Sequence, residues 1–235
     1  LMSITFIIPC YNCEKIIFRN FLKINKFIKL HKLKTKIIFI NDGSKDNTLK
    51  VLNKIKNKSI SIVNNKTNLG KSKSIINCLK LVNTKYVVLI DCDLSYFRYL
   101  KDVTNSLRNN DLICVNRRLA KSKSLEKDYN LYQISRNLIS NILGNIIEKK
   151  LKLGVKGDTQ AGLKAFKFFK DFKKKKFISQ YYFFDIELIN FFKQKNLKIK
   201  LIPVKYKISR RSSIKFFSMK NFYILLEFYK VLLKN

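Results

Sequence analysis

The sequence predicts an α/β fold, Rossmann-like, in which helices cover both faces of a mainly parallel sheet. Through the first half of the chain, short apolar runs rich in β-branched residues alternate with segments of helical periodicity. The apolar runs lack a polar face, as expected of strands buried on both sides, and polar residues follow their carboxyl ends. The length of 235 residues fits one such domain with a small appendage.

In chain order, the first half of the sequence alternates strand and helix. The expected strands are 4–9, 36–40, 60–63, 86–90 and 112–115, and the expected helices are 16–33, 46–56, 71–82 and 97–107. The second of these strands ends at Asn41-Asp42-Gly43, which is typical of a turn. Because ligands of parallel sheets bind beyond the carboxyl ends of the strands, we expect the functional site there.

The second half has longer amphipathic segments. We expect helices at 131–153, 181–195 and 216–233, a strand at 198–206, and a mixed polar and apolar segment at 158–166. The helices near the carboxyl end carry apolar residues on one side and lysines on the other. We therefore divide the chain into a main domain at 1–210 and a C-terminal amphipathic, membrane-proximal helix at 211–235.

The formal net charge of +35 indicates an anionic partner, such as a phosphorylated substrate, an anionic membrane or a nucleic acid. Of the 50 basic residues, 42 are lysines spread almost evenly along the chain, so a coding bias towards lysine explains most of the charge. A nucleic-acid-binding protein would gather basic residues on one face beside aromatic platforms. It remains the distant alternative, and we expect no nucleic-acid partner.

The five cysteines and the absence of a long apolar run indicate the compartment. An odd number of cysteines without a visible targeting peptide suits free thiols in a reducing environment. The Cys10-x-x-Cys13 pair lacks the second ligand pair that a zinc site needs. No run of about 18 uncharged apolar residues occurs, so no spanning helix is predicted. We expect a cytoplasmic location, peripheral on the cytosolic face of a membrane.

Three acidic residues stand at expected strand ends. Asp42 follows one strand, and Asp91 and Asp93 follow another. Carboxylates spaced at i and i+2 beyond a strand can both reach one hard cation, and Mg²⁺ or Mn²⁺ there would bridge the phosphates of a nucleotide. The alternative is that these side chains only cap a helix and close a turn.

Four segments together resemble the signatures of the family 2 glycosyltransferases of the GT-A type. They occur in the family's order at 3–12 (SITFIIPCYN), 38–48 (IFINDGSKDNT), 68–71 (NLGK) and 89–95 (LIDCDLS). Later segments resemble dolichyl-phosphate β-glucosyltransferases and bacterial polyprenyl-phosphate sugar transferases. These are 158–166 (DTQAGLKAF), 184–188 (FDIEL), 202–206 (IPVKY) and 211–214 (RSSI). The resemblance therefore extends over nearly the whole chain.

The resemblance implies roles for the residues that match the motifs. On the nucleotide-sugar side, Pro9, Tyr11 and Asp42 would border the base, and Asp91 and Cys92 would lie along the ribose and phosphates. Arg117 would face the donor, and Arg210 or Arg211 would close over its diphosphate. A guanidinium fork suits phosphate oxygens, although contact with membrane or solvent is an equal alternative for Arg210 and Arg211. For Lys71, a solvated surface position is favoured over contact with phosphate.

The implied metal is Mg²⁺ or Mn²⁺, held by Asp93 with Asp91 and Ser95. Two departures from the family pattern stand near this site. Cys13 occupies a position where the family usually has an acid, with Glu14 one place later, and Cys92 replaces a small residue. Cys13 leaves open an inactive relative as a further alternative.

The implied reaction is an inverting, metal-dependent transfer of a hexose to a polyprenyl or dolichyl phosphate. UDP-glucose is the favoured donor and GDP-mannose the second. A phosphate acceptor needs no general base because its second pKa is about 6. Asp158 is therefore expected nearest the chemistry as an orienting or sugar-binding group, as is Asp185, with a simple loop turn as the alternative for Asp158. The main rival acceptor is a glycan hydroxyl in cell-surface polysaccharide synthesis.

Membrane contact is expected through two amphipathic segments, 138–153 and 216–233. Relatives often carry spanning helices, so this chain would bind peripherally or through a separate membrane-anchoring subunit. The alternative is that both helices simply pack on the sheet.

Overall fold

The computed structural model describes residues 2–126, 131–207 and 219–234, apart from the side chains of 132 and 219–222. Its strands are β1 (Ser3–Cys10), β2 (Lys34–Asp42), β3 (Ile60–Asn65), β4 (Tyr86–Ile90), β5 (Leu112–Asn116), β6 (Lys123–Ser124), β7 (Leu163–Lys167), β8 (Ile199–Pro203) and β9 (Lys205–Tyr206). Its helices are α1 (Glu14–Leu30), α2 (Thr48–Ile55), α3 (Lys71–Leu79), the 3₁₀ turn η1 (Phe97–Tyr99), α4 (Leu100–Ser106), α5 (Leu131–Leu151), α6 (Asp171–Lys174), α7 (Phe184–Gln194) and α8 (Met219–Lys234).

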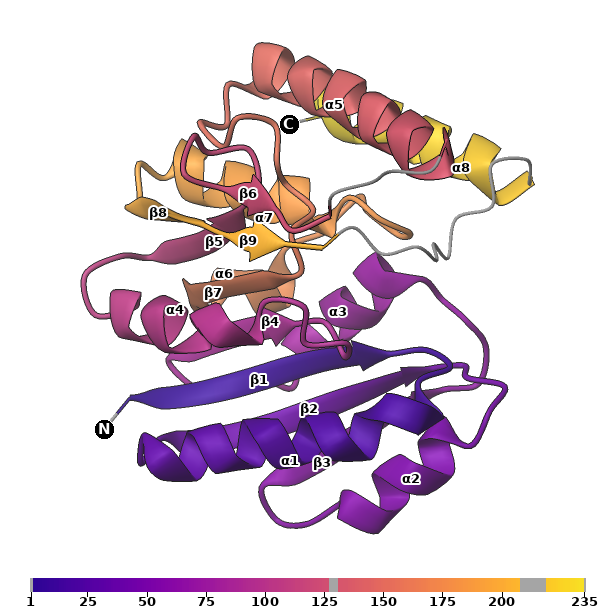
Figure 1. The fold of residues 1–235 in the computed structure, drawn as a ribbon, viewed down its shortest axis with the longest axis vertical. Coiled ribbons are helices and arrows are strands. Elements are labelled where there is room, and N and C mark those ends of the chain that lie inside the picture. The colour runs from indigo at the N-terminus through magenta and orange to yellow at the C-terminus, as the bar shows by residue number, and fades with distance from the viewer. Residues whose placement is uncertain (1, 127–130, 208–218, 235) are drawn as a thin grey trace.

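Seven strands form one sheet in the order β3-β2-β1-β4-β7-β5-β8 (Figure 1). All neighbouring pairs are parallel except those of β7, which runs antiparallel to both β4 and β5. The short strands β6 and β9 form a separate parallel pair. The carboxyl ends of β1, β2 and β4 therefore meet at one edge of the sheet, and β7 begins at that same edge.

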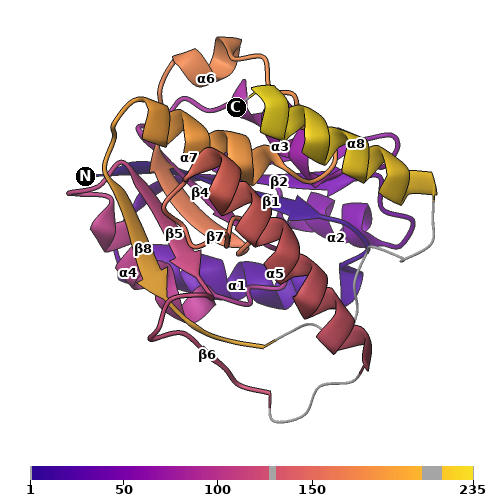
Figure 2. The same ribbon diagram turned by 90° about the horizontal axis from the view of Figure 1, so that it is seen from above.

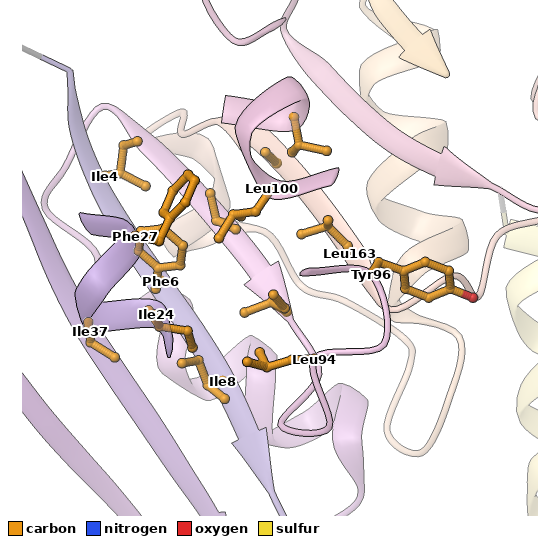
Figure 3. Packing of buried hydrophobic residues seen from close by; sticks show 14 of the residues in the cluster. Ile4, Phe6, Ile8, Ile24, Phe27, Ile37, Leu94, Tyr96, Leu100 and Leu163 are labelled. Atoms are coloured by element: carbon orange, nitrogen blue, oxygen red, sulfur yellow. The ribbon is translucent and has the colours of Figure 1, made fainter. Parts of the chain in front are cut away.

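Helices cover both faces of the sheet, and successive residues of β1 show why. Phe6 and Ile8 point to a core shared with α1, α2 and α4, whereas Ile7 points to a second core shared with α3 and α7. Figure 3 shows the first core, in which Phe27 of α1 and Leu100 of α4 close over the strands. Because both faces are buried, the strands need apolar residues at every position, as the sequence predicted.

Helices α5 and α8 lie side by side beyond the β5 and β8 end of the sheet (Figures 1 and 2). Phe228 and Val231 of α8 join the second core. The Glu227 carboxylate accepts hydrogen bonds from the backbone N–H groups of Tyr181, Tyr182 and Phe183, directly before α7. In the described ranges, no helix is both long enough and apolar enough to cross a membrane.

The predicted class, a mainly parallel α/β sheet with helices on both faces, is confirmed. Strand β7 was missed: segment 158–166 was expected only as a mixed region, although 163–167 is a central strand. The charged Lys164 interrupts its apolar run, yet its side chain is buried. The strand expected at 198–206 is divided at Val204 into β8 and β9.

Candidate active site

The turn after β2 is built around a buried carboxylate. Asp42 is 4% exposed, and its Oδ1 accepts hydrogen bonds from Asn65 Nδ2, Leu69 N and Ser74 Oγ at 2.8–2.9 Å, while Oδ2 accepts one from Gly70 N at 3.0 Å. These bonds hold the loop that leads into α3. The structure therefore places Asp42 underneath the loop that precedes Lys71.

The next residue, Gly43, permits this packing. Its φ is +65°, and a Cβ atom there would lie 2.4 Å from the backbone carbon of Thr67. A side chain at position 43 would therefore push the 67–68 backbone away and strain the turn.

The carboxylate of Asp91 lies directly beyond β4 and forms an ion pair with Lys71 at the start of α3. The distance from Lys71 Nζ to Asp91 Oδ1 is 2.6 Å, and both side chains are about one-third exposed to solvent. Burial acts to lower the pKa of the Lys71 ammonium, but the nearby Asp91 charge outweighs it and the pKa rises. The lysine is therefore a permanent cation next to Asp91.

Gly162, just before β7, makes room for Asp91. The Asp91 N–H donates to the Gly162 carbonyl at 3.0 Å, and a Cβ atom on Gly162 would lie 2.1 Å from Asp91 Oδ2. Any side chain at position 162 would therefore displace the carboxylate.

The second acid of the turn, Asp93, faces solvent. Its Oδ1 accepts a hydrogen bond from Ser95 N at 3.0 Å, which closes the turn together with Leu94 in the left-handed region at φ 55°. Asp93 is thus available to a ligand on the outer side, while Asp91 faces inward.

A small cavity of about 10 Å³, room for about one water molecule, lies between β4, β7, α3 and α7. Its charged lining residues are Lys71, Asp91, Lys164 and Asp185, and Pro9 closes one side. Lys164 Nζ lies 2.8 Å from Asp185 Oδ1 and donates to the Ala161 carbonyl at 2.8 Å. Two lysines and two aspartates therefore alternate around one space.

Asp158 forms a forked ion pair with Arg117 at the end of β5. Arg117 donates to both carboxylate oxygens from its side chain, with an NH2-to-Oδ1 distance of 2.6 Å, and its backbone N–H donates to Oδ2 at 2.6 Å. Burial would raise the pKa of Asp158, but the Arg117 charge and hydrogen bonds lower it overall. Asp158 is therefore held as a carboxylate.

Tyr96 connects the acidic turn with this ion pair and was missed in the sequence. Its hydroxyl points away from the core packing around Leu94 (Figure 3). Burial raises the pKa of Tyr96 to about 12, and the charges of Arg117, Asp158, Asp91 and Asp93 also act on it. The phenol therefore lies within the electrostatic influence of the acidic turn and of the Arg117–Asp158 pair.

The described candidate residues lie near one another at one edge of the sheet. Pro9 and Asp91 line the cavity, Arg117 and Asp158 form a pair next to Tyr96, and the remaining described candidates follow strand ends at the same edge. These are Tyr11, Asp42, Cys92, Asp93 and Ser95. Tyr11 is 42% exposed, and Cys92 is partly exposed. Arg210 and Arg211 lie outside the described residues.

Lys164 was not singled out in the sequence, and Lys71 was read as a surface lysine. Lys164 lies in a strand whose sequence, LKAFK, contains two lysines, so the sequence carries no signal for its burial. Lys71 ends the NLGK segment of the family resemblance, and nothing else distinguishes it in a chain with 42 lysines.

A divalent cation fits the outer side of this site. Within the described ranges, no group of three or more His, Cys, Asp or Glu side chains could hold a metal by itself. Mg²⁺, however, usually binds through one or two carboxylates together with substrate phosphates and water. Asp93 offers one exposed carboxylate of this kind, whereas one oxygen of Asp91 is already paired with Lys71.

Comparisons with known proteins agree with the geometry. The sheet order and the acidic turn beyond β4 define a glycosyltransferase of the GT-A type. A family model described as "Glycosyl transferase family 2" matches residues 5–173. The chain belongs to this family.

The aligned region covers different shares of the two relatives described next. It is 27% identical over 234 residues to dolichyl-phosphate beta-glucosyltransferase ALG5D of Trichomonas vaginalis, which covers 92% of this chain and 69% of that protein. It is 35% identical over 94 residues to poly-beta-1,6-N-acetyl-D-glucosamine synthase of Staphylococcus aureus, covering 40% of this chain and 22% of that protein. The second likeness is therefore confined to part of both chains.

Among solved structures, glucosyl-3-phosphoglycerate synthase from Mycobacterium tuberculosis, in complex with Mn²⁺ and UDP-glucose, has a similar fold. The TM-score is 0.62 at 17% identity, covering 98% of this chain and 77% of that one. At 17% identity, the similarity shows a shared fold and no more.

Proposed function

We propose that this chain transfers a hexose from a nucleoside-diphospho-sugar to a polyprenyl phosphate, with UDP-glucose the favoured donor and GDP-mannose the second. The likeness to a dolichyl-phosphate beta-glucosyltransferase over 92% of the chain supports this choice. The observation that carries it is the pairing of the inner carboxylates with cations, because it suits an acceptor that arrives already ionised.

The donor would lie across the carboxyl ends of β1, β2 and β4. Pro9, Tyr11 and Cys92 would border the nucleotide, and Asp42 would act as a positioning residue that holds the loop before Lys71. Arg210 or Arg211 would close over the diphosphate. Asp93, Asp91 and Ser95 would hold Mg²⁺ or Mn²⁺, which when bound supplies charge neutralisation to the departing diphosphate. The Lys71 ammonium adds a second, protein-borne positive charge on the inner side.

The pairing of the inner carboxylates with cations favours a phosphate acceptor over a hydroxyl acceptor. A hydroxyl acceptor requires a general base to remove its proton. Asp158 and Asp185 are each within 2.6–2.8 Å of a cation, and the pKa of Asp158 is lowered, which makes it a weaker base. A phosphate monoester, with a second pKa of about 6, is largely dianionic at neutral pH and attacks without a base.

The direction of attack is proposed to be in line with the departing group. The acceptor phosphate would approach the anomeric carbon from outside the cavity, which has room for only about one water molecule. The departing diphosphate would be on the opposite side of the sugar, so that the configuration inverts. Catalysis would then depend on orientation and on fixed charges rather than on proton transfer.

Membrane contact is supported by an exposed apolar surface on α5 and α8. The surface consists of Leu131, Ile134, Leu138, Ile139, Ile142 and Ile146 of α5 with Tyr223, Leu225, Leu226, Tyr229 and Leu233 of α8, each at least 39% exposed. Helices with such a face lie in the headgroup region of a bilayer. The surface would bring the site to a lipid-borne acceptor from the cytosolic side.

The test is to incubate the purified protein with Mg²⁺, a short polyprenyl phosphate and each of several nucleotide sugars, and to identify the glycolipid by mass spectrometry. We expect a polyprenyl-phospho-hexose with UDP-glucose and none without the divalent cation. The partial likeness to a poly-beta-1,6-N-acetyl-D-glucosamine synthase favours one rival, transfer to a glycan hydroxyl. Product on an oligosaccharide acceptor but none on the lipid would establish that rival instead.

A further inference from the structure

Helix α5 supports the loop that carries Asp158. The loop directly follows the helix, and three of its backbone N–H groups donate to one carboxylate of the helix. The Oε1 atom of Glu148 accepts from Gly154 N at 2.7 Å. Its Oε2 atom accepts from Val155 N at 3.2 Å and from Gly157 N at 3.1 Å. Because a carboxylate is a stronger acceptor than a neutral group, this one side chain fixes much of the loop backbone.

The helix and the loop also touch backbone to backbone. Gly144 of α5 is buried, and a Cβ atom on it would lie 2.6 Å from the Gly157 carbonyl oxygen and 2.0 Å from NH1 of Arg118. Gly157 has a φ of +70°, and a Cβ atom there would lie 2.4 Å from the Gly144 carbonyl oxygen. The loop can therefore lie this close to α5 only because both residues are glycine.

The end of β5 holds the same loop. The NH2 group of Arg118 donates to a backbone carbonyl of α5 at 2.5 Å, and its NH1 group donates to the Lys156 carbonyl at 3.3 Å. Asn116 Nδ2 donates to the Val155 carbonyl at 2.6 Å. The residues on either side of Arg117 therefore tie β5, the loop and α5 together.

These contacts end at one ion pair. Asp158 N donates to the Val155 carbonyl at 3.0 Å, and the Asp158 carboxylate meets the Arg117 guanidinium at 2.6 Å. We propose that Glu148 is a positioning residue, which holds the Asp158 carboxylate against Arg117 by fixing the loop between them. Glu148 acts through the loop backbone and has no part in the chemistry itself.

On the proposed function, this arrangement connects the bilayer with the site. Leu138 and Ile142 lie on the exposed face of α5, whereas Gly144 and Glu148 contact the loop. The helix would thus hold Asp158 at a fixed position relative to the membrane on which it lies. This consequence rests on the proposed function, whereas the positioning of Asp158 does not.

A double-mutant cycle in urea unfolding at pH 7 tests the positioning directly. Glu148→Gln keeps the size of the side chain but removes its charge and one of its two acceptor oxygens. If the loop then releases Asp158, less is left for Asp158→Asn to remove. We expect Asp158→Asn to raise the unfolding equilibrium constant by a factor at least about tenfold smaller in the Glu148→Gln background than in the unaltered protein.

The matched control background is Asn145→Ala, at an exposed position of the same helix. There, Asp158→Asn should raise the unfolding constant by the same factor as in the unaltered protein. An equal factor in the Glu148→Gln background would show that the two residues act independently and would overturn the proposal.

Gly144→Ala tests the same contact from the helix. Alanine forms helices more readily than glycine, so this change would stabilise α5 if the helix only lay beside the loop. We expect instead that the backbone N–H groups of Gly154, Val155 and Gly157 exchange with solvent at least about tenfold faster, as measured by NMR. Unchanged exchange at these three positions would contradict the proposal, and this measurement applies even if Glu148→Gln does not fold.

Kinetics connect the positioning with the proposed function. With UDP-glucose, Mg²⁺ and a polyprenyl phosphate, Glu148→Gln should lower kcat at least about tenfold while the affinity for UDP with Mn²⁺ stays unchanged. Asn145→Ala should change neither. An unchanged kcat, or an equal loss of UDP affinity, would contradict the positioning role. Absence of transfer in the unaltered protein would instead contradict the proposed function and leave the unfolding result standing.

Discussion

Each of the carboxylates Asp91, Asp158 and Asp185 has a lysine or arginine partner at 2.6–2.8 Å. Asp93 differs, since its side chain faces solvent and accepts a hydrogen bond from Ser95 within its own turn. Residues of the same type thus have different tasks. Asp91 and Asp185 line the charged cavity, Asp158 is held by Arg117, and Asp93 is the exposed carboxylate that we propose meets a cation on the donor.

The exposed carboxylate gives the most direct test of metal dependence. Asp93→Ala should abolish transfer and the dependence on Mg²⁺ or Mn²⁺, because the site loses its outer oxygen ligand. The free energy of unfolding should change by less than about 0.5 kcal/mol, since the position is on the surface. Transfer rates with and without chelator, together with urea unfolding, measure both effects. Full activity of the variant under chelation would defeat the assignment.

Gly162 tests whether the position of Asp91 matters. Gly162→Ala would place a Cβ atom 2.1 Å from the present position of Asp91 Oδ2, so the carboxylate must rotate away from Lys71. We expect the affinity for Mn²⁺ with UDP to fall by about tenfold, equivalent to about 1.4 kcal/mol. In the control Gly154→Ala the added Cβ meets open space but φ is +75°, so the variant should lose some stability and still bind normally. Normal binding by Gly162→Ala would contradict the role given to Asp91.

Asp158 predicts a pH dependence of stability. Its pKa is lowered in the folded protein, so its ion pair stabilises the fold above the unfolded pKa of about 3.9, and this contribution is lost as the pH falls through the folded pKa. Asp158→Asn should therefore cost about 3 kcal/mol at pH 7 and less at pH 3, where part of the contribution is lost. Urea unfolding at both pH values measures this.

The control for this prediction is Asp171→Asn. Its ion pair with Lys195 is exposed, so removal should cost less than about 1 kcal/mol. An equal loss of stability for Asp158→Asn at pH 7 and pH 3 would show that the charge of Asp158 is not what stabilises the fold.

At the scale of elements, the strands β1 to β5 and the helices between them were predictable because each obeys a single periodicity. Strand β7 was not, since Lys164 breaks its apolar run. Burial of Lys164 becomes understandable only when α7 brings Asp185 against it. A sequence pattern shows which residues are apolar, but it does not show which charged residue will meet a partner from a distant element.

The candidate site could be predicted only where its residues follow a well-marked strand. Asp91 and Asp93 could be assigned because they follow a well-marked strand. Tyr96 could not, since its importance arises from charges contributed by β5 and the loop before β7. Asp42 holds the loop before α3 through hydrogen bonds from Leu69 and Gly70, and the sequence alone does not show these bonds.

Helices α5 and α8 carry the prediction of membrane binding. Leu138 and Ile142 are 59% and 51% exposed, and replacing both with Gln should weaken binding to vesicles that contain anionic lipid by at least about tenfold. Leu30→Gln is the matched control, because Leu30 is 72% exposed at the end of α1, far from α5 (Figure 1). Vesicle flotation measures the bound fraction. Equal flotation of the double variant and the control would exclude this surface.

At the scale of the whole molecule, the charge of +35 acts as a background field. On the proposed function it would draw the protein to anionic bilayers, with each lysine near the surface contributing about 1 kcal/mol, but it would not choose the acceptor. That choice would belong to the site, where Lys71 and Lys164 are already paired with Asp91 and Asp185. Charge near the membrane and charge at the site thus have separate effects.

The most direct test compares two acceptors that differ only in the phosphate: a polyprenyl phosphate and the corresponding polyprenol. With the nucleotide sugar and divalent cation held constant, we expect rapid transfer to the phosphate, with a rate that declines as the pH falls below about 6 and the acceptor gains a proton. Transfer to the polyprenol should be at least about 100-fold slower, because the carboxylates that could serve as its base are paired with cations. Comparable rates on both lipids would contradict the account.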